Sequence, residues 1–273
     1  FPAKYVGSGD EKTDITSAVQ AKALREKLVD QKFSITSVKT GERRKNPQPP
    51  FTTSNLQQEA VRKLSFTTKK TMQIAQMLYE GVDIEGEGTV GLISYIRTDS
   101  TRLSDEALTA ARDYISANFA PEYLPETPNI YKGRKNAQDA HEAIRPTHAL
   151  FSPEKVKASL TRDQYRLYKL IYYRYLASQM TPAVYDTLAV ELGSGEAQFR
   201  FGGMKKKFAG FTVLYEESQD EPAEKESNLP KVQVGDQVTM KELDAAQHFT
   251  QPPARYTEAS LVRAMEEKGV GRP

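Results

Sequence analysis

The sequence contains no cysteine, no tryptophan and no long hydrophobic run. The lack of cysteine excludes disulfides, thiolate zinc sites and cysteine nucleophiles. The longest apolar stretches, such as residues 90–96, are far shorter than the ~20 residues that a membrane-spanning helix needs. The N-terminal residues also lack the apolar region of a signal peptide. The chain starts without methionine and stops directly after a helical pattern, so we expect a piece of a longer protein.

Charge is balanced over the whole chain but uneven along it. The 273 residues include 38 Lys and Arg against 36 Asp and Glu, for a net charge of +2. Residues 38–72 are strongly basic, whereas residues 215–227 are strongly acidic and have no role that the sequence reveals. A basic run is usually a solvated face, but it is also typical of proteins that bind nucleic acid.

Hydrophobic periodicity predicts both helices and strands. The predicted helices cover residues 15–30, a segment starting at 54, and 68–80, 105–119, 161–179 and 257–268. The predicted strands cover residues 33–38, 90–96, 184–192, 197–201, 208–214 and 238–243. A basic, proline-rich loop is expected at 41–53. The tyrosines Tyr172, Tyr173 and Tyr175 could stack on nucleic-acid bases, but their helical spacing favours a role in the core.

The order of these elements predicts an α+β protein of more than one domain. Strand-rich ends (1–54 and 181–247) flank a helix-rich middle (55–180), which suggests that a helical domain is inserted into an antiparallel β domain. A further helical segment begins in residues 248–273. At about 150 residues per domain, this length is expected for roughly two domains.

Some familiar site motifs are present only in part. Residues 86–91 match G-x-G-x-x-G, but a nucleotide-binding loop of this kind follows a strand, whereas a predicted helix precedes this one. A flexible connector is the simpler interpretation. His141 and Glu142 begin H-E-x-x-H, but Arg145 stands where the second zinc ligand would be. The sequence has no G-x-x-x-x-G-K-[ST] loop, so it predicts no ATP site.

Reactive side chains are concentrated in residues 94–101 (SYIRTDST), at the end of a predicted strand. If the strand continues, Tyr95 and Arg97 share one face, because side chains alternate with period 2. A tyrosine phenol is a poor nucleophile at neutral pH, but a nearby guanidinium favours the phenolate and also binds phosphate. The pair suits attack on a phosphodiester. A half-buried strand tyrosine followed by a polar turn would show the same pattern.

Cations also lie beside potential phosphate-binding groups in two later segments. Residues 140–147 (AHEAIRPT) combine the base His141 with Arg145, although a helix end capped by an arginine would look similar. Near the C-terminus, Arg255 precedes Thr257, a predicted N-cap, and a helix N-terminus attracts phosphate. Arg272 lies in the final GVGRP turn.

The segments GLISYIRTDSTRLS, AHEAIRPT and QPPARYTEASLVRAMEEKGVGRP resemble the signature motifs of bacterial type IA DNA topoisomerases, in the same order, and the resemblance covers essentially the whole chain. It implies that Tyr95 attacks one DNA strand and becomes 5′-phosphotyrosyl, while Arg97 positions the scissile phosphate. It also implies that His141 contributes to DNA binding and that Arg255 and Arg272 belong to the DNA groove. From their chemistry, we add Arg145 and Thr257 to the predicted DNA-binding residues.

The resemblance also assigns the predicted domains and their surroundings. Residues 55–180 would be the tyrosine-bearing domain, the β-rich flanks an arch that opens the DNA gate, and residues 248–273 the start of the groove domain. The family's Toprim domain, which binds Mg²⁺, has no counterpart in this chain, so we expect magnesium in the full enzyme and no metal site in this fragment. The expected partner is single-stranded or negatively supercoiled DNA, without ATP or a membrane, in the bacterial cytoplasm at the nucleoid.

These features leave more than one predicted function. In the first, the chain is part of an enzyme that relaxes negatively supercoiled DNA without ATP, and the fragment alone is inactive because half of its site is missing. In the second, the chain is a non-catalytic module that binds single-stranded DNA or forms the gate. A tyrosine recombinase or type IB enzyme would need a different set of Arg, His and Lys residues, which we do not find.

Overall fold

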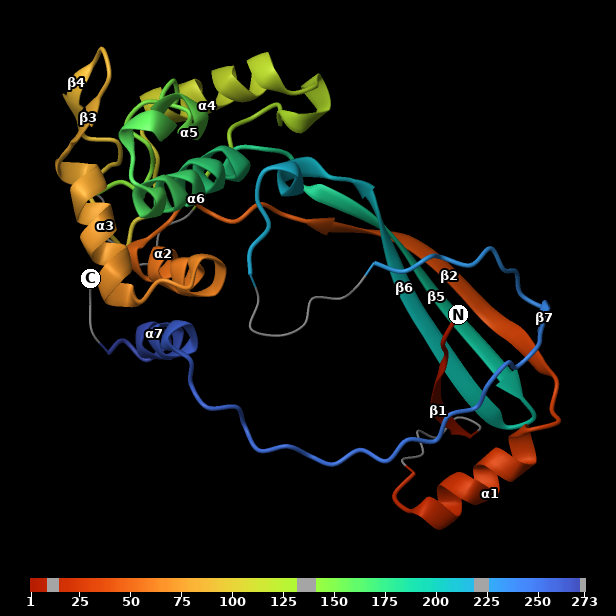
Figure 1. The fold of residues 1–273 in the computed structure, drawn as a ribbon. Coiled ribbons are helices and arrows are strands. Elements are labelled where there is room, and N and C mark those ends of the chain that lie inside the picture. Colours follow the sequence, from red (N-terminus) through yellow and green to blue (C-terminus); the bar gives the residue numbers. More distant parts are fainter. Residues whose placement is uncertain (9–14, 132–140, 219–225, 271–273) are drawn as a thin grey trace. The chain divides into compact units, whose positions relative to one another are not determined.

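The computed structural model describes residues 1–8, 15–131, 141–218 and 226–270 (Figure 1). Contacts divide the chain into two compact units. Unit 1 consists of residues 1–44, 184–208 and 224–253, and unit 2 consists of residues 45–183, 209–223 and 254–273. Contacts therefore group 209–223 and 254–273 with the helices. The domain boundaries at 54, 180 and 247 stay predictions.

Unit 1 is built on a five-stranded sheet with the order β1-β6-β5-β2-β7. Its strands are β1 (Lys4–Ser8), β2 (Phe33–Lys45), β5 (Ala183–Ser194), β6 (Ala197–Phe208) and β7 (Gln237–Val238). The pairs β1–β6, β5–β6 and β2–β7 are antiparallel. The long β5–β6 hairpin turns at Gly195, whose φ of +56° favours glycine. The predicted antiparallel β architecture is confirmed.

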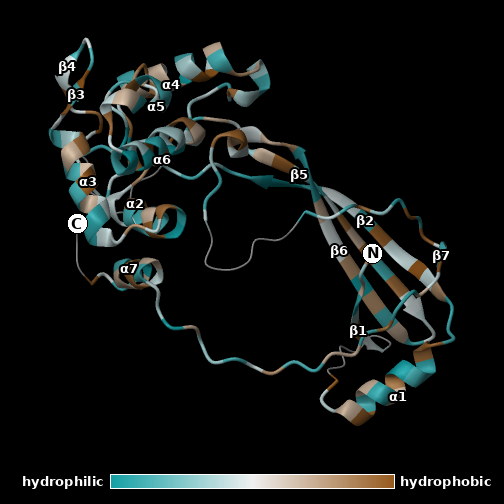
Figure 2. Cartoon of the chain, viewed as in Figure 1, coloured by the Kyte–Doolittle hydropathy of each residue, from teal (hydrophilic) through white to brown (hydrophobic). Residues whose placement is uncertain are grey.

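The core of unit 1 follows from alternation along its strands. Leu188, Val190 and Leu192 point to the same side of β5 and are buried, because successive strand residues face opposite ways. Figure 2 shows the resulting bands of hydrophobic and hydrophilic residues. Phe33 of β2 packs edge-on against Phe199 of β6, with ring centroids 5.6 Å apart. The helix α1 (Ala18–Leu28) adds its last residue to this core.

Three sequence predictions in the β regions are wrong. Strand β2 continues to Lys45, into the expected loop at 41–53, because it pairs in the sheet beside β5. The expected strand at 208–214 is instead a 3₁₀ turn (Gly210–Val213). Gly210 has a φ of +50°, and a Cβ there would lie 2.4 Å from the Pro182 carbonyl oxygen. The expected strand at 238–243 is reduced to β7, and residues 239–257 form neither helix nor strand.

Unit 2 is mainly helical. Its helices are α2 (Thr53–Glu59), α3 (Thr68–Glu80), α4 (Asp105–Asn118), α5 (Pro153–Val156), α6 (Arg162–Ser178) and α7 (Glu258–Glu267). A serine or threonine hydroxyl accepts a backbone N–H at the N-terminus of each one, as at Ser104 and Thr161. The G-x-G-x-x-G segment overlaps a hairpin of β3 (Val82–Ile84) and β4 (Gly88–Val90), not a phosphate loop.

Helix α6 forms the centre of unit 2. Tyr168, Tyr172 and Tyr175 are buried, and each hydroxyl donates to a backbone carbonyl at 2.5–2.6 Å. Burial raises the pKa of Tyr175 to about 12. The predicted core role is confirmed for Tyr172 and Tyr175, whereas Tyr173 is half-buried and donates to Glu154. These bonds join α6 to the carbonyls of Phe151, Ala149 and Ala107, which lie close in sequence to residues of the candidate site.

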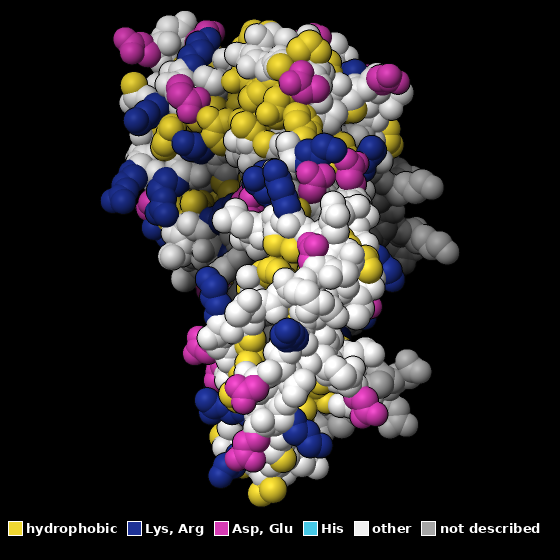
Figure 3. All heavy atoms as spheres, turned by 90° about the vertical axis from the view of Figure 1, so that its right-hand side faces the viewer, with side chains coloured by type: hydrophobic (Ala, Val, Ile, Leu, Met, Phe, Trp, Pro, Cys, Tyr) yellow, Lys and Arg dark blue, Asp and Glu magenta, His cyan; other side chains and the backbone are white. Residues whose placement is uncertain are grey.

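A buried ionic cluster joins the basic and acidic segments within unit 2. Arg174 and Glu59 are each 1% exposed, and the Tyr215 hydroxyl donates to Glu59. Lys63 donates to the carbonyl of Glu216 and lies over the Tyr215 ring. From the acidic stretch 215–227, Glu217 also lies 3.5 Å from the guanidinium of Arg174. On the face drawn in Figure 3, side chains of both charges are interspersed around hydrophobic areas.

Helix α7 packs against α2 and the start of α3 (Figure 1). The Glu258 carboxylate accepts from the backbone N–H and the hydroxyl of Thr68 at 2.7 and 2.6 Å, and these bonds lower the Glu258 pKa. At the other end of α7, Glu266 accepts from the Ser54 hydroxyl at 2.7 Å. Within the described ranges, no helix has the length and apolar character to cross a bilayer.

Candidate active site

The segment that carries Tyr95 is not a strand, and it bends at Ile96 and Arg97. Between residues 91 and 98, here called the tyrosine segment, the only ladder contact described is an isolated bridge between Ile93 and Pro146. The predicted strand at 90–96 is therefore wrong. The Ser94 N–H donates to the Arg145 carbonyl and the Thr147 N–H to the Leu92 carbonyl on either side of this bridge. The ladder goes no further because the Leu92 N–H donates to the Leu78 carbonyl at 2.8 Å and the Arg145 N–H to the Ser94 hydroxyl at 3.0 Å, instead of to the carbonyls opposite them.

Exposed and buried side chains nevertheless alternate over residues 95–98 of the tyrosine segment. Tyr95 and Arg97 are exposed, whereas Ile96 and Thr98 are buried. Thr53, the first residue of α2, fixes this register: its hydroxyl donates to the Ile96 carbonyl at 2.7 Å and accepts the Thr98 N–H at 2.9 Å. The sequence predicted one shared face for Tyr95 and Arg97, and both side chains are on the solvent side.

Two rings flank the side chain of Tyr95, which is 44% exposed. Tyr79, at the end of α3, has its ring centroid 5.7 Å away at an interplanar angle of 69°. His141 lies on a loop, residues 141–148, here called the histidine loop, and its ring centroid is also 5.7 Å from that of Tyr95. The structure thus brings the predicted nucleophile and the predicted base together from segments far apart in sequence.

A pocket of about 480 Å³ opens beside these rings. Its lining comes from the tyrosine segment, the first turn of α4 and the histidine loop: Ser94, Tyr95, Glu106, His141, Glu142, Arg145, Thr147 and His148. Of the predicted site residues, Tyr95, His141 and Arg145 line it. The sequence analysis missed Glu106, His148 and Tyr79, and a signal existed only for Glu106, which lies in the first turn of the helix predicted at 105–119.

The side chain of Arg145 is hydrogen-bonded to neighbouring residues of the protein. Its Nε donates to the Glu142 carboxylate at 2.7 Å and its Nη1 to the Pro146 carbonyl at 2.9 Å. Hydrogen bonds of Ser94 also join the tyrosine segment to the histidine loop. The Ser94 N–H donates to the Arg145 carbonyl at 2.9 Å, and the Ser94 hydroxyl accepts the Arg145 N–H at 3.0 Å and donates to the Ala143 carbonyl at 2.7 Å.

The other predicted cations lie outside this pocket. Arg97 is exposed and has no ionic or hydrogen-bond partner among the described residues. Arg255 is exposed in the irregular chain before α7. Thr257 is the N-cap of α7, as predicted, and its hydroxyl accepts the Ser260 N–H at 3.1 Å. Arg272 lies outside the described residues.

The pocket does not fit a magnesium ion. Across the part of the chain that the structure describes, no three His, Asp or Glu side chains come together as metal ligands. Of the two carboxylates in the pocket, Glu142 is already bonded to Arg145. Because Mg²⁺ prefers several oxygen ligands, these residues alone offer it no cage, and no step of the chemistry below depends on one. The magnesium site expected in a Toprim domain stays a prediction.

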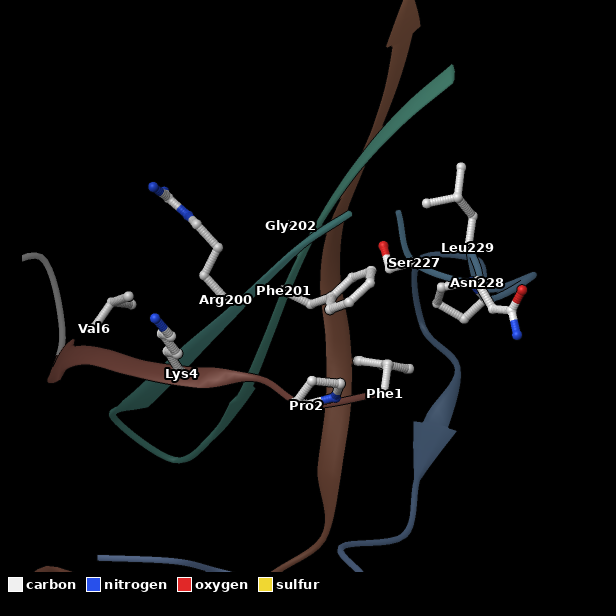
Figure 4. Close-up of a pocket in the computed structure, with 11 residues that line it drawn as sticks. Phe1, Pro2, Lys4, Val6, Arg200, Phe201, Gly202, Ser227, Asn228 and Leu229 are labelled. Carbon is white, nitrogen blue, oxygen red and sulfur yellow. The ribbon is translucent and has the colours of Figure 1, made fainter. Parts of the chain in front are cut away.

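A second hollow, of about 800 Å³, lies in unit 1 (Figure 4). Phe1, Phe201 and Leu229 give it apolar walls, and Lys4 and Arg200 stand at its edge. No carboxylate, histidine or tyrosine is among the residues that line it. Of these two pockets, the one beside Tyr95 is the one that combines histidines, carboxylates and a tyrosine.

Comparison with known proteins shows the family of the chain. A family model described as DNA topoisomerase matches residues 3–273, which is nearly the whole chain. The chain belongs to the bacterial type IA DNA topoisomerase family. It is also similar to the structure of full-length topoisomerase I from Thermotoga maritima, with 35% sequence identity and a TM-score of 0.78. The match covers 99% of this chain and 42% of the Thermotoga protein. This topoisomerase chain thus spans less than half the length of that relative.

Proposed function

We propose that this chain carries the nucleophile of a type IA topoisomerase, which relaxes negatively supercoiled DNA without ATP. The observation that carries the proposal is Tyr95, a solvent-accessible tyrosine beside a histidine, in a pocket, within a chain of this family. The substrate would be DNA with a single-stranded stretch, and the protein would act at the bacterial nucleoid.

In the proposed reaction, the Tyr95 oxygen attacks a DNA phosphorus and loses its proton. The phosphorus–O3′ bond breaks, the 3′ oxygen takes up a proton, and the 5′ phosphate stays on the tyrosine. One phosphodiester replaces another, so the bond energy is kept and religation by the 3′ hydroxyl needs no ATP. Arg97 has no protein partner among the described residues and is free to bind the phosphate as charge develops.

The decisive experiment replaces Tyr95 with phenylalanine in the full-length protein that contains this chain. Relaxation of supercoiled plasmid and the covalent protein–DNA adduct should both disappear, while DNA binding persists. The matched control is Tyr165→Phe on α6, which also removes one hydroxyl and should leave relaxation unchanged. A covalent adduct formed by the Tyr95→Phe protein would overturn the assignment.

For the chain on its own, we propose the alternative role of a DNA-binding gate module that cleaves nothing. The described residues contain no cluster of His, Asp and Glu that could bind magnesium, and the chain covers less than half of the Thermotoga relative. Incubation of the isolated chain with end-labelled single-stranded DNA should give no labelled protein. A labelled adduct would show that the site is already complete.

A further inference from the structure

Arg145 lies where the tyrosine segment crosses the histidine loop. Its backbone exchanges hydrogen bonds with Ser94, the residue directly before Tyr95. Its side chain turns back over the loop that presents His141. Arg145 is therefore bonded to both segments whose rings meet at the candidate nucleophile.

The guanidinium of Arg145 donates its hydrogen bonds to neighbouring groups of the protein. An arginine has five N–H donors in a fixed plane. Nε meets Glu142 at 2.7 Å, and Nη1 meets the carbonyls of Pro146 and Thr147 at 2.9 and 3.5 Å. Nη2 reaches the hydroxyl of Ser104, the N-cap of α4, at 3.5 Å. One side chain thereby connects the histidine loop with the start of α4.

The electrostatics also distinguish Arg145 from a DNA ligand. Its side chain is only 17% exposed, and the carboxylate of Glu142, 22% exposed, neutralises it. An approaching phosphate would have to lie beside that carboxylate, and the two negative charges would repel each other. Arg97, by contrast, is exposed and has no described partner.

We propose that the Arg145–Glu142 pair is a positioning device: it holds His141 and Ser94 in place around Tyr95 and sets the rate of DNA cleavage, without binding DNA itself. This proposal rests on the proposed function of Tyr95. A misplacement of about 1 Å at a reacting group can cost roughly a hundredfold in rate, so loosening this pair should slow cleavage while leaving DNA affinity intact.

The test uses Glu142→Gln and the charge-balanced double variant Glu142→Gln/Arg145→Gln in the full-length protein, with an oligonucleotide substrate. Single-turnover adduct formation gives a rate constant and an amplitude, and anisotropy gives the DNA Kd at several salt concentrations. The rate constant should fall about tenfold or more in both variants, with the Kd within about twofold of the parent and an unchanged salt slope. The matched control is Glu191→Gln, which removes the carboxylate of the exposed Arg200–Glu191 pair at 2.6 Å in unit 1 and should change nothing.

Other results would overturn the proposal. If Arg145 is a DNA ligand, Glu142→Gln should tighten DNA binding, and the double variant should weaken it and reduce the salt slope by about 0.7. If the pair only supports folding, the amplitude falls while the rate constant of the surviving protein is unchanged. Parental cleavage rates in both variants, beside an inactive Tyr95→Phe protein, would sink the positioning role and leave the proposed function standing.

Discussion

Replacing Arg174 with methionine should destabilise unit 2 strongly. Arg174 is 1% exposed, and its Nε donates to the Pro49 carbonyl at 2.7 Å. The guanidinium lies 4.9 Å from the centroid of the Phe51 ring and 5.0 Å from that of Tyr215. The change removes a cation that contacts two separate segments of unit 2. One lies near Pro49, where the chain enters the unit, and the other near Tyr215, where the chain returns to it.

The contacts set the expected magnitude. A charge-assisted hydrogen bond such as that to Pro49 contributes about 1.5–3 kcal/mol. The 3.5 Å pair with Glu217, which is 33% exposed, adds little. Methionine keeps part of the packing on the rings but leaves the Pro49 carbonyl without its donor, whereas Glu59 keeps Arg62 at 3.7 Å and Lys63 at 4.0 Å. We therefore expect a loss of about 2–4 kcal/mol, from the charge-assisted bond and the carbonyl left without a donor. For a unit of this size, that corresponds to a fall in Tm of roughly 4–16 °C.

Thermal unfolding followed by near-ultraviolet circular dichroism of the tyrosines measures this effect. Arg162→Met, at the exposed start of the same helix, is the matched control and should change Tm by less than about 2 °C. A fall in Tm for Arg174→Met no larger than that of the control would refute the reasoning.

Two further changes test the surroundings of the site. Gly91→Ala should slow adduct formation and lower Tm, because a Cβ there would lie 2.7 Å from the Tyr79 carbonyl oxygen. Gly202→Ala, where a Cβ would meet no atom within 4 Å, should do neither. Equal effects of the two changes would contradict this reasoning. The Glu258 carboxyl should titrate below its ordinary pKa of 4.5, since Thr68 bonds favour its charged form. The docking of α7 that depends on this carboxylate should be complete above pH 4.5 and weaken as pH falls through the lowered pKa; carbon-13 NMR that finds a midpoint at or above 4.5 would count against it.

Much of the helical architecture is predictable because its signals are local. The bounds of α3 agree with the prediction at both ends, since Thr67 caps the start and Gly81 follows the last residue. Helix α4 begins after Ser104, as predicted. The strand predictions succeeded where alternation was long, as in β5. They failed at 90–96, where pairing depended on a distant segment containing Pro146.

The candidate site shows the same division. The sequence predicted Tyr95, Arg97 and His141 as site residues through motifs whose chemistry suits phosphate transfer, and the match over residues 3–273 shows the family. It did not indicate that Tyr79 would flank Tyr95, or that Glu106 and His148 would line the pocket. These neighbours come from the end of α3, the start of α4 and the histidine loop.

By itself, the sequence determined the family, predicted several helices and the β5–β6 region, and named a candidate nucleophile, because the signals for each lie in contiguous residues. Only the tertiary structure decided what each charge does. Arg97 and Arg145 are both arginines beside reactive motifs, yet one is exposed and the other is bonded to Glu142 and two backbone carbonyls. A side chain's partners are set by segments that meet in space, and the free energy of burying or pairing a charge depends on those partners.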